Sequence, residues 1–551
     1  MRRRWLVDGV RWPVDGERWP VVGEPAATDH PAHRSLITDH PVWLVPLLIG
    51  VATFAVGASL VDGLPVGVTN DDGMYVILAK SLATGHGYRW LNLPGTPAAI
   101  HFPPGYPAFL ALLWLLWPSF PANVVLFKLA NALLMAVVAA GVFVFVRQRL
   151  RMSDTAAAAL TFGATLGIPM LTLSTIVMSE PLFLALLLPS LLLAERVAGD
   201  ERSSVRDLVL LALLTAAATL VRTHGIALIG SVIIVLCFRR RFTHAVIFAG
   251  VALLPVVPWQ IWVSAHSGAL PQAMRGNYES YGAWLATGLH TDGIGLFAHT
   301  IARTSLEIAG MMVQVTAPSL PPLLRIAALG AIVALGAFGA RELWRAARVT
   351  ALFIGLYAVI VLMWPFPPTR FIWGIWPLVM LLPVAGVRWT MLQSPLTRGF
   401  RLARMSALIA GVLLAIGYAS YNARGYRQRW WSSIPRAVSR TSSPLLTWVA
   451  TRTPRDVLLA SEVESSVYLY TGRTVVPVTT FTTDEYFTPR TASENAAAMR
   501  EIVAHYHPNA VVITSTSMRE AARVLAFATP PVLAAVDTFP AGGLVLIPTP
   551  R

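Results

Sequence analysis

Long apolar runs alternate with short arginine-rich stretches along the chain between residues 42 and 421. An α-helix needs about eighteen or more apolar residues to cross a bilayer, and on that basis the pattern predicts about eleven transmembrane helices. The predicted spans are 42–63, 121–146, 154–174, 180–197, 206–222, 225–238, 243–264, 322–340, 350–366, 370–388 and 404–421.

The arginine-rich stretches predict which side of the membrane each loop occupies. They are 147–151, 195–206, 238–242, 341–348 and 388–404, and loops of this composition stay in the cytoplasm. The N-terminus is then inside and the C-terminal tail outside, at the cytoplasmic (inner) membrane. This alternation requires that the apolar stretches 105–118 and 296–318 lie in, or re-enter from, the outer interface. The large outer loops are 64–120 and 265–297.

The two ends of the chain differ from this membrane portion. Residues 1–40 carry the near-repeats RWLVDG, RWPVDG and RWPVVG with many prolines, which predicts a disordered cytoplasmic arm. The apolar run after the arm lacks a cleavage site and is expected to stay as the first span. Residues 422–551 alternate strand-like and helix-like segments, which predicts a small α/β domain outside the membrane.

The elements expected in that domain follow this alternation. Strands are expected at 457–460, 474–478, 510–514 and as a closing pair at 532–547, with helices at 465–470, 494–505 and 517–528. The fold class is therefore a polytopic α-helical membrane protein, with a transmembrane domain at 41–421 and an extracytoplasmic α/β domain at 422–551.

Composition narrows the possible partners. The chain of 551 residues is 55% apolar and 13% charged, with a net charge of +15. A soluble protein this basic would suggest nucleic acid, but here the arginines lie in short loops between apolar runs, so no nucleic acid partner is expected. The single cysteine, Cys237, lies inside an apolar run and excludes a disulfide framework or a cysteine-ligated metal site.

The stretch NDDGMYVILAKSLATGHGY at 70–88 places two adjacent carboxylates, Asp71 and Asp72, at the water-facing end of the first span. One interpretation is a helix cap, made by Asn70 or Asp71. The other is chemistry, because such carboxylates can take a proton from a hydroxyl or bind a cation. The residues that follow predict an amphipathic helix on the membrane surface that carries Tyr75.

Further polar residues lie at the outer ends of the predicted spans. The prolines of HFPPGYP fix His101 and Tyr106 near the same surface, and Glu180 opens a span. Arg370 lies at an outer span mouth, where an unpaired arginine is costly. Arg222 and His224 lie at another outer helix end, where snorkelling explains Arg222 equally well, just as a favourable helix-dipole charge explains Glu180 equally well. In the second outer loop, Arg275, Asn277 and Tyr278 are candidate contacts or flexible surface.

Four motifs in order, NDDGMYVILAKSLATGHGY, HFPPGYP, MSEPLF at 178–183 and TRFIWGIWPL at 369–378, resemble the GT-C membrane glycosyltransferases. The group with the greatest resemblance depends on polyprenyl-phosphate sugars and includes protein mannosyltransferases and lipid A aminoarabinose transferases. The resemblance implies a GT-C fold and transfer of a sugar from a polyprenyl-phosphate carrier to a lipid, glycan or protein acceptor outside the membrane.

The resemblance also implies roles for individual residues. The acidic pair of the family, usually Asp-Glu with a tyrosine shortly after, falls on Asp71 and Asp72 with Tyr75. Asp71 is then the general base of an inverting displacement, and Asp72 orients the acceptor or shares a metal. The second outer acid of the family falls on Glu180. His101 stands where relatives often carry Lys or Tyr, and we expect it, like Arg370, to contact the carrier phosphate.

The sequence leaves some alternatives open. Asp71, Asp72 and Glu180 together could hold Mg²⁺ or Mn²⁺ through oxygen, and no cofactor is otherwise expected. A transporter or flippase for a lipid-linked sugar is the alternative function, but most charges lie at span ends, and no internal repeat stands out. A third interpretation, a membrane anchor for the outer α/β domain, leaves the acids of the first outer loop unexplained.

Overall fold

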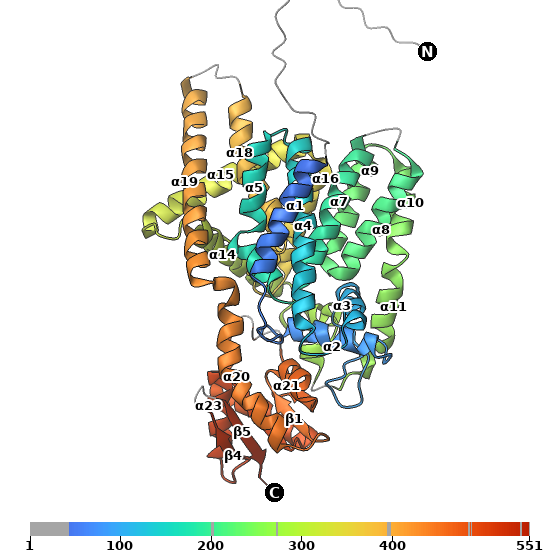
Figure 1. Ribbon diagram of the computed structural model, residues 1–551, viewed down its shortest axis with the longest axis vertical. Coiled ribbons are helices and arrows are strands. Elements are labelled where there is room, and N and C mark those ends of the chain that lie inside the picture. The colour runs from blue at the N-terminus through green and yellow to red at the C-terminus, as the bar shows by residue number, and fades with distance from the viewer. Residues whose placement is uncertain are drawn as a thin grey trace, which may run out of the picture. The chain divides into compact units, whose positions relative to one another are not determined.

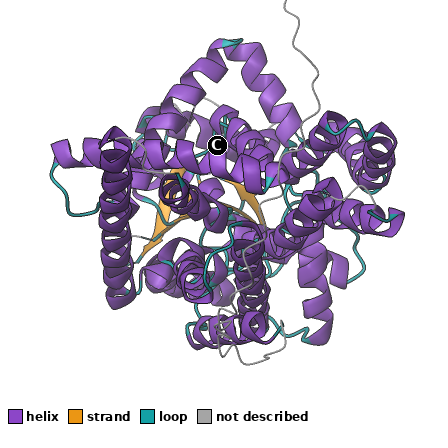
Figure 2. Ribbon diagram, turned by 90° about the horizontal axis from the view of Figure 1, so that it is seen from above, coloured by secondary structure: helices purple, strands orange, loops and turns teal. Residues whose placement is uncertain are grey.

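The computed structural model describes residues 43–199, 203–271, 274–393, 398–482, 485, 488–539 and 543–549. The predicted arm at 1–40 lies outside these residues. Helices make up most of the described chain, and the strands form a single small sheet (Figure 2).

Every predicted span coincides with one helix or with a pair of helices. The single helices are α1 (Leu44–Ser59), α4 (Val124–Arg149), α7 (Glu180–Gly199), α8 (Val205–Val221), α9 (Ile226–Phe238), α15 (Pro322–Ala346), α16 (Arg348–Met363), α18 (Trp376–Leu392) and α19 (Arg398–Gln428). Among the described residues, four helices are long and apolar enough to cross a membrane, or six if each of two bent pairs is one span. The count of eleven therefore stays a prediction.

The two bent pairs have a common cause. Helices α5 (Asp154–Thr165) and α6 (Ile168–Ser174) meet at 53°, and α10 (Phe242–Leu253) and α11 (Val256–His266) at 45°. Pro255 lies in the second break, and Pro169 is the second residue of α6, just after the first break. Because proline has no N–H and its ring clashes with the preceding turn, the helix cannot continue straight through it.

Short helices lie at the end of the bundle next to the C-terminal domain. They are α2 (Asp71–Ala83), α3 (Gly105–Leu116), α12 (Arg275–Tyr278), α13 (Tyr281–Asp292) and α17 (Thr369–Trp373). The helix between α13 and α15, α14 (Gly295–Thr316), is longer, with 22 residues, and packs on α16 and α19. Figure 1 shows α2 and α3 at the end of the bundle next to the C-terminal domain. Helix α3 rises about 18 Å, too little to span a bilayer. Gly105 allows α3 to lie against the end of α8, because a Cβ there would be 2.7 Å from the Leu220 carbonyl oxygen.

The C-terminal domain confirms the predicted alternation of strands and helices. After α20 (Ser433–Arg452) come β1 (Leu458–Ser461), α21 (Glu464–Thr471), β2 (Thr474–Pro477), α22 (Ala492–Tyr506), β3 (Ala510–Ile513), α23 (Thr516–Ala526), β4 (Leu533–Thr538) and β5 (Leu544–Pro548). The strand order is β2-β1-β3-β5-β4. The first three strands are parallel, and β5 pairs antiparallel with both β3 and β4. The prediction of a helical membrane protein with a C-terminal α/β domain is confirmed.

Helix α21 of the C-terminal domain packs directly on the loop that precedes α2. The Ser466 hydroxyl donates to the Gly67 carbonyl oxygen at 2.8 Å, and the Val66 N–H donates to the Tyr470 hydroxyl at 3.0 Å. A Cβ at Gly67, whose φ is +85°, would lie 2.3 Å from the Ser466 hydroxyl oxygen. The two domains therefore meet at the segment that carries the acidic pair.

Candidate functional site

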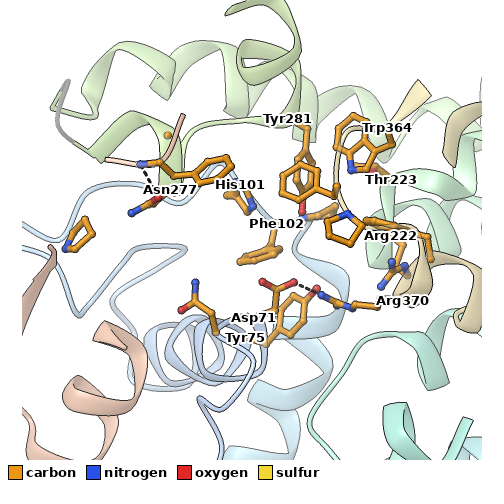
Figure 3. A pocket seen from close by; sticks show the side chains of 18 of the residues that line it. Asp71, Tyr75, His101, Phe102, Arg222, Thr223, Asn277, Tyr281, Trp364 and Arg370 are labelled. Carbon is orange, nitrogen blue, oxygen red and sulfur yellow. Dashed lines mark hydrogen bonds and ion pairs between the residues drawn. The ribbon is translucent and has the colours of Figure 1, made fainter. Parts of the chain in front are cut away.

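A cavity of about 530 Å³ lies where the helix ends of one side of the bundle, the loops that join them and the C-terminal domain meet. Its lining includes Asp71, Tyr75 and His101 from the first outer loop, Arg222 and His224 after α8, and Arg370 from α17. These six candidate residues therefore share one cavity, together with Asn277 from the second loop, although they are up to 299 positions apart in the chain. Figure 3 shows the side chains of Asp71, Tyr75 and Arg370 close together in it.

Asp71 is the first residue of α2 and presents its carboxylate to the cavity. The residue before it, Asn70, has a φ of +66° and makes no side-chain cap, so the predicted cap by Asn70 is not formed. The Asp71 carboxylate forms an ion pair with the Arg370 guanidinium, and both side chains are 28% exposed. Asp71 is thus a carboxylate at the cavity surface whose partner is also open to the cavity.

Arg370 also joins a buried ion-pair network. Its Nε donates to Glu180 Oε1 at 2.6 Å, and an Arg222 terminal nitrogen donates to the same oxygen at 2.6 Å. Glu180 is fully buried and does not line the cavity. Glu180 therefore holds two guanidiniums side by side, a geometry that suits a positioning role, and its catalytic role stays a prediction.

A second layer supports this network. Arg222 also donates to the Ser179 hydroxyl at 3.0 Å, and the Tyr75 hydroxyl lies 3.3 Å from the same oxygen. Tyr106, a predicted substrate contact, is fully buried, packs edge-on to Tyr75 and donates to Asn131. Tyr106 therefore lies behind Tyr75 and outside the cavity lining, and its contact with substrate stays a prediction.

Asp72 turns away from the cavity. Its carboxylate accepts hydrogen bonds from the backbone N–H groups of Gly67, Val68 and Thr69, and from the Thr69 hydroxyl at 2.9 Å. Burial raises the pKa of this carboxyl, and these hydrogen bonds oppose the rise. Asp72 thus holds the loop before α2 and does not line the cavity, and its predicted catalytic role stays a prediction.

His101 lines the cavity, but its ring is not arranged to donate to a phosphate. Its Nδ1 lies 2.6 Å from the Glu279 carbonyl oxygen, and because a carbonyl only accepts, Nδ1 carries the proton. Burial lowers the pKa of His101, which favours the neutral imidazole. Its Nε2 is then an acceptor, suited to a sugar hydroxyl. The contact of His101 with the carrier phosphate stays a prediction.

His224 lies in an aromatic corner beside Arg222. Its ring packs near Phe371 and Tyr357, with centroids 5.0 and 5.4 Å away. Its Nε2 is buried and has no hydrogen-bond partner among the described residues. A buried polar atom without a partner is costly, so this nitrogen is available for a ligand in the cavity.

The three acids expected to share a metal are not brought together. Asp72 faces the loop, while the Arg370 guanidinium lies between Asp71 and Glu180. In the described part of the chain, no group of three or more His, Cys, Asp or Glu side chains is arranged to hold a metal ion. The cation nearest to these acids is therefore a guanidinium.

The sequence analysis did not single out Glu464, which lines the cavity from the first turn of α21. The Tyr278 hydroxyl donates to Glu464 Oε1 at 3.1 Å and accepts from the Asn92 amide at 2.9 Å. Burial raises the pKa of Glu464 to about 7. Its sequence context is an ordinary helix start, so only the packing of the two domains reveals this carboxyl.

Comparison with known proteins defines the class of fold. No protein-family profile and no curated protein sequence matches the chain. Two crystal structures of ArnT from Cupriavidus metallidurans are similar to it, each covering 92% of this chain and 99% of the ArnT chain. The apo structure has a TM-score of 0.52 at 16% identity, and the one bound to undecaprenyl phosphate has 0.50 at 15%. The chain therefore has the fold of these ArnT structures.

Proposed function

We propose that this protein is a membrane glycosyltransferase that moves a sugar from a polyprenyl-phosphate carrier to an extracytoplasmic acceptor. The observation that carries the proposal is the Asp71 carboxylate beside the Arg370–Glu180–Arg222 network at one cavity. A base next to two fixed guanidiniums suits a reaction that takes a proton from one group and leaves charge on a phosphate. The undecaprenyl phosphate in the ArnT structure supports this class of carrier.

The chemistry is a single inverting displacement. The acceptor hydroxyl oxygen forms a bond to the anomeric carbon while its proton passes to Asp71. The bond between the anomeric carbon and the carrier phosphate oxygen breaks, and its electron pair leaves with the phosphate. Arg370 and Arg222 stabilise that charge, because guanidiniums donate bidentately to phosphate. No metal is needed for this balance of atoms and charge.

The ion pair between Asp71 and Arg370 gives the reaction an order. While Asp71 and Arg370 are paired, the guanidinium binds the carboxylate oxygen that must accept the proton. The carrier phosphate competes for Arg370 and thereby frees Asp71. Glu180, which holds the other edge of the guanidinium at 2.6 Å, keeps Arg370 in place during this exchange. We therefore expect donor binding before acceptor activation.

The position of the site agrees with an extracytoplasmic reaction. The apolar helices fit a membrane protein, and the arginine-rich loops lie at the helix ends away from the cavity, such as Arg239 and Arg240 after α9. The positive-inside rule then orients the N-terminus to the cytoplasm and the C-terminal domain outside. Protease protection of tags at each terminus in sealed vesicles tests this orientation.

The test of function follows the fate of the labelled sugar. Membranes containing the protein are supplied with radiolabelled undecaprenyl-phosphoryl sugars and an extract of membrane lipids and glycans. A transferase moves label from the carrier to another molecule, whereas a flippase leaves it on the carrier. Asp71→Asn should abolish the movement, and the exposed Asp292→Asn on α13 should leave it unchanged. If the labelled carrier crosses the vesicle membrane with its sugar still attached, the result would favour the transporter.

A further inference from the structure

The cavity has two chemically different ends. Figure 3 shows Arg222 and Arg370 on one side of Asp71 and Asn277 on the other. The Asn277 side is the side of the C-terminal domain, because its amide donates to the Thr479 carbonyl and accepts from the Phe481 N–H, both at 3.2 Å. Asp71 therefore lies between the guanidiniums and a wall made by the C-terminal domain.

That wall is acidic. Its described lining residues are Glu462, Glu464, Pro477, Val478, Thr479, Phe481 and Glu485, among which there is no Lys, Arg or His. The described cations of the cavity, Arg222 and Arg370, lie at the other end. The C-terminal wall thus offers acceptors of hydrogen bonds and carboxyl groups, and none of its described lining residues is a cation.

Two of the three glutamates are already engaged within the domain. Both carboxylate oxygens of Glu462 accept hydrogen bonds from Thr514 or Ser515 at the start of α23. Glu485 pairs with Arg490 at 3.0 Å and accepts from the Thr482 N–H at 2.7 Å. These two residues hold the domain together, so their charge is partly satisfied before any ligand arrives.

Glu464 differs from them in its surroundings. It is 3% exposed, it lines the cavity, and its side-chain partner, Tyr278, comes from the membrane domain. Tyr278 is itself held by the Asn92 amide, so the hydroxyl that meets Glu464 is fixed in direction. Burial raises the pKa of Glu464 to about 7, which is the signature of a carboxyl kept in an environment that does not suit its charge.

We propose that the C-terminal wall is the acceptor subsite and that Glu464 binds a hydroxyl-bearing acceptor group that carries no phosphate. This inference rests on the proposed function. An acceptor hydroxyl donates a hydrogen bond to the Glu464 carboxyl, which directs a neighbouring hydroxyl of the same acceptor toward Asp71. A phosphate in this position would find no Lys, Arg or His among the described lining residues of the wall to pair with, which disfavours it relative to an uncharged hydroxyl group.

The product linkage tests the acceptor class. After transfer from labelled undecaprenyl-phosphoryl sugar, unreacted donor is removed by extraction and the product is treated with mild acid. A sugar attached to a hydroxyl survives as a glycoside, whereas a sugar attached to a phosphate is released. We expect at least tenfold more label in the acid-stable product. Label mainly in an acid-labile product would overturn the inference while leaving the proposed transferase intact.

The role of Glu464 is tested in the full-length protein with Glu464→Gln. Transfer is measured against a dilution series of the acceptor extract, and binding of undecaprenyl phosphate is measured separately. We expect the apparent KM for acceptor to rise at least tenfold, while the Kd for undecaprenyl phosphate stays within twofold. Glu501→Gln, which removes an exposed charge on α22 of the same domain, should change neither value.

The other outcomes are also informative. If Glu464→Gln weakens undecaprenyl phosphate binding and acceptor use together, Glu464 only supports the domain contact, and the inference is overturned. An unchanged KM for acceptor overturns it as well. If the wild-type protein neither binds undecaprenyl phosphate nor transfers label, the proposed function itself fails, which is a different result from a changed preference among acceptors.

Discussion

The two faces of helix α2 serve different purposes, although the residues that define them are neighbours. On the cavity face, Asp71 is 28% exposed and pairs with Arg370. On the opposite face, Asp72 is fully buried and holds the loop 67–69, which in turn packs on α21 of the C-terminal domain. Consecutive residues of an α-helix point about 100° apart, so one acidic pair can supply both a reactive group and a structural one.

The difference also shows how the site is kept rigid. The loop that Asp72 fixes leads directly into Asp71, and the same loop receives the Ser466 contact. A reactive carboxylate must be held within a fraction of an ångström of its working position. The buried face of α2 therefore determines where the cavity face places its carboxylate.

The largest expected effect comes from Asp71→Asn on the cavity face. The amide keeps the shape and one oxygen for Arg370, but it cannot accept a proton. We expect the transfer rate to fall 100-fold or more, with an unchanged midpoint of thermal denaturation. Initial rates at saturating donor, together with thermal scans in the same detergent, measure both quantities. If Asp72→Asn lost more rate per folded molecule than Asp71→Asn, the two faces would have been assigned the wrong way round.

A smaller loss is expected for Arg370→Lys. Lysine keeps the charge, but a single ammonium cannot join two carboxylates in the fork geometry by which Arg370 holds Asp71 and Glu180. We expect transfer to fall by about 10-fold to 100-fold and the Kd for undecaprenyl phosphate to rise.

The matched control for this change is Arg388→Lys, which alters an arginine paired with Glu342 at 2.8 Å elsewhere in the bundle. It should leave both values near those of the wild type. If transfer falls by a similar factor in both variants, the loss in Arg370→Lys comes from disturbed helix packing and not from the ion pairs at the cavity.

Asp72→Asn should affect stability instead of chemistry. The amide can accept from only one oxygen, and its nitrogen would face the backbone donors of the loop 67–69. We expect a loss of about 1 to 3 kcal/mol in the free energy of unfolding, with transfer per folded molecule within about threefold of the wild type. Thermal scans measure the change in stability, and active-site titration measures transfer per folded molecule. An unchanged denaturation midpoint would show that the loop does not depend on this carboxylate.

Much of this arrangement could be predicted from the sequence. The apolar runs located the helices, and the strand-like segments located all five strands, because both depend on local patterns. Arg370 was singled out because a charge at a helix mouth is costly without a partner, and Asp71 because of its carboxylate chemistry and the family resemblance; both line the cavity. The division between Asp71 and Asp72 could not be predicted, since it depends on whether α2 begins at residue 71 or at residue 73. Glu464 was missed because its position in the cavity depends on how two domains pack, which no local pattern contains.

The smallest expected effect is the pH dependence of stability that Glu464 causes. This residue lines the cavity from α21, the helix that packs on the loop before α2. Its pKa is about 7 in the folded protein, against an ordinary value of 4.5. Between these values the folded protein keeps the proton and the unfolded chain has lost it, so stability falls as pH rises, until pH exceeds 7. From pH 6 to pH 7.5 the loss should be about 1 kcal/mol. Thermal midpoints of the wild type should therefore fall relative to Glu464→Gln over this range. A constant difference would mean that Glu464 does not titrate there and that the C-terminal wall carries its full charge throughout.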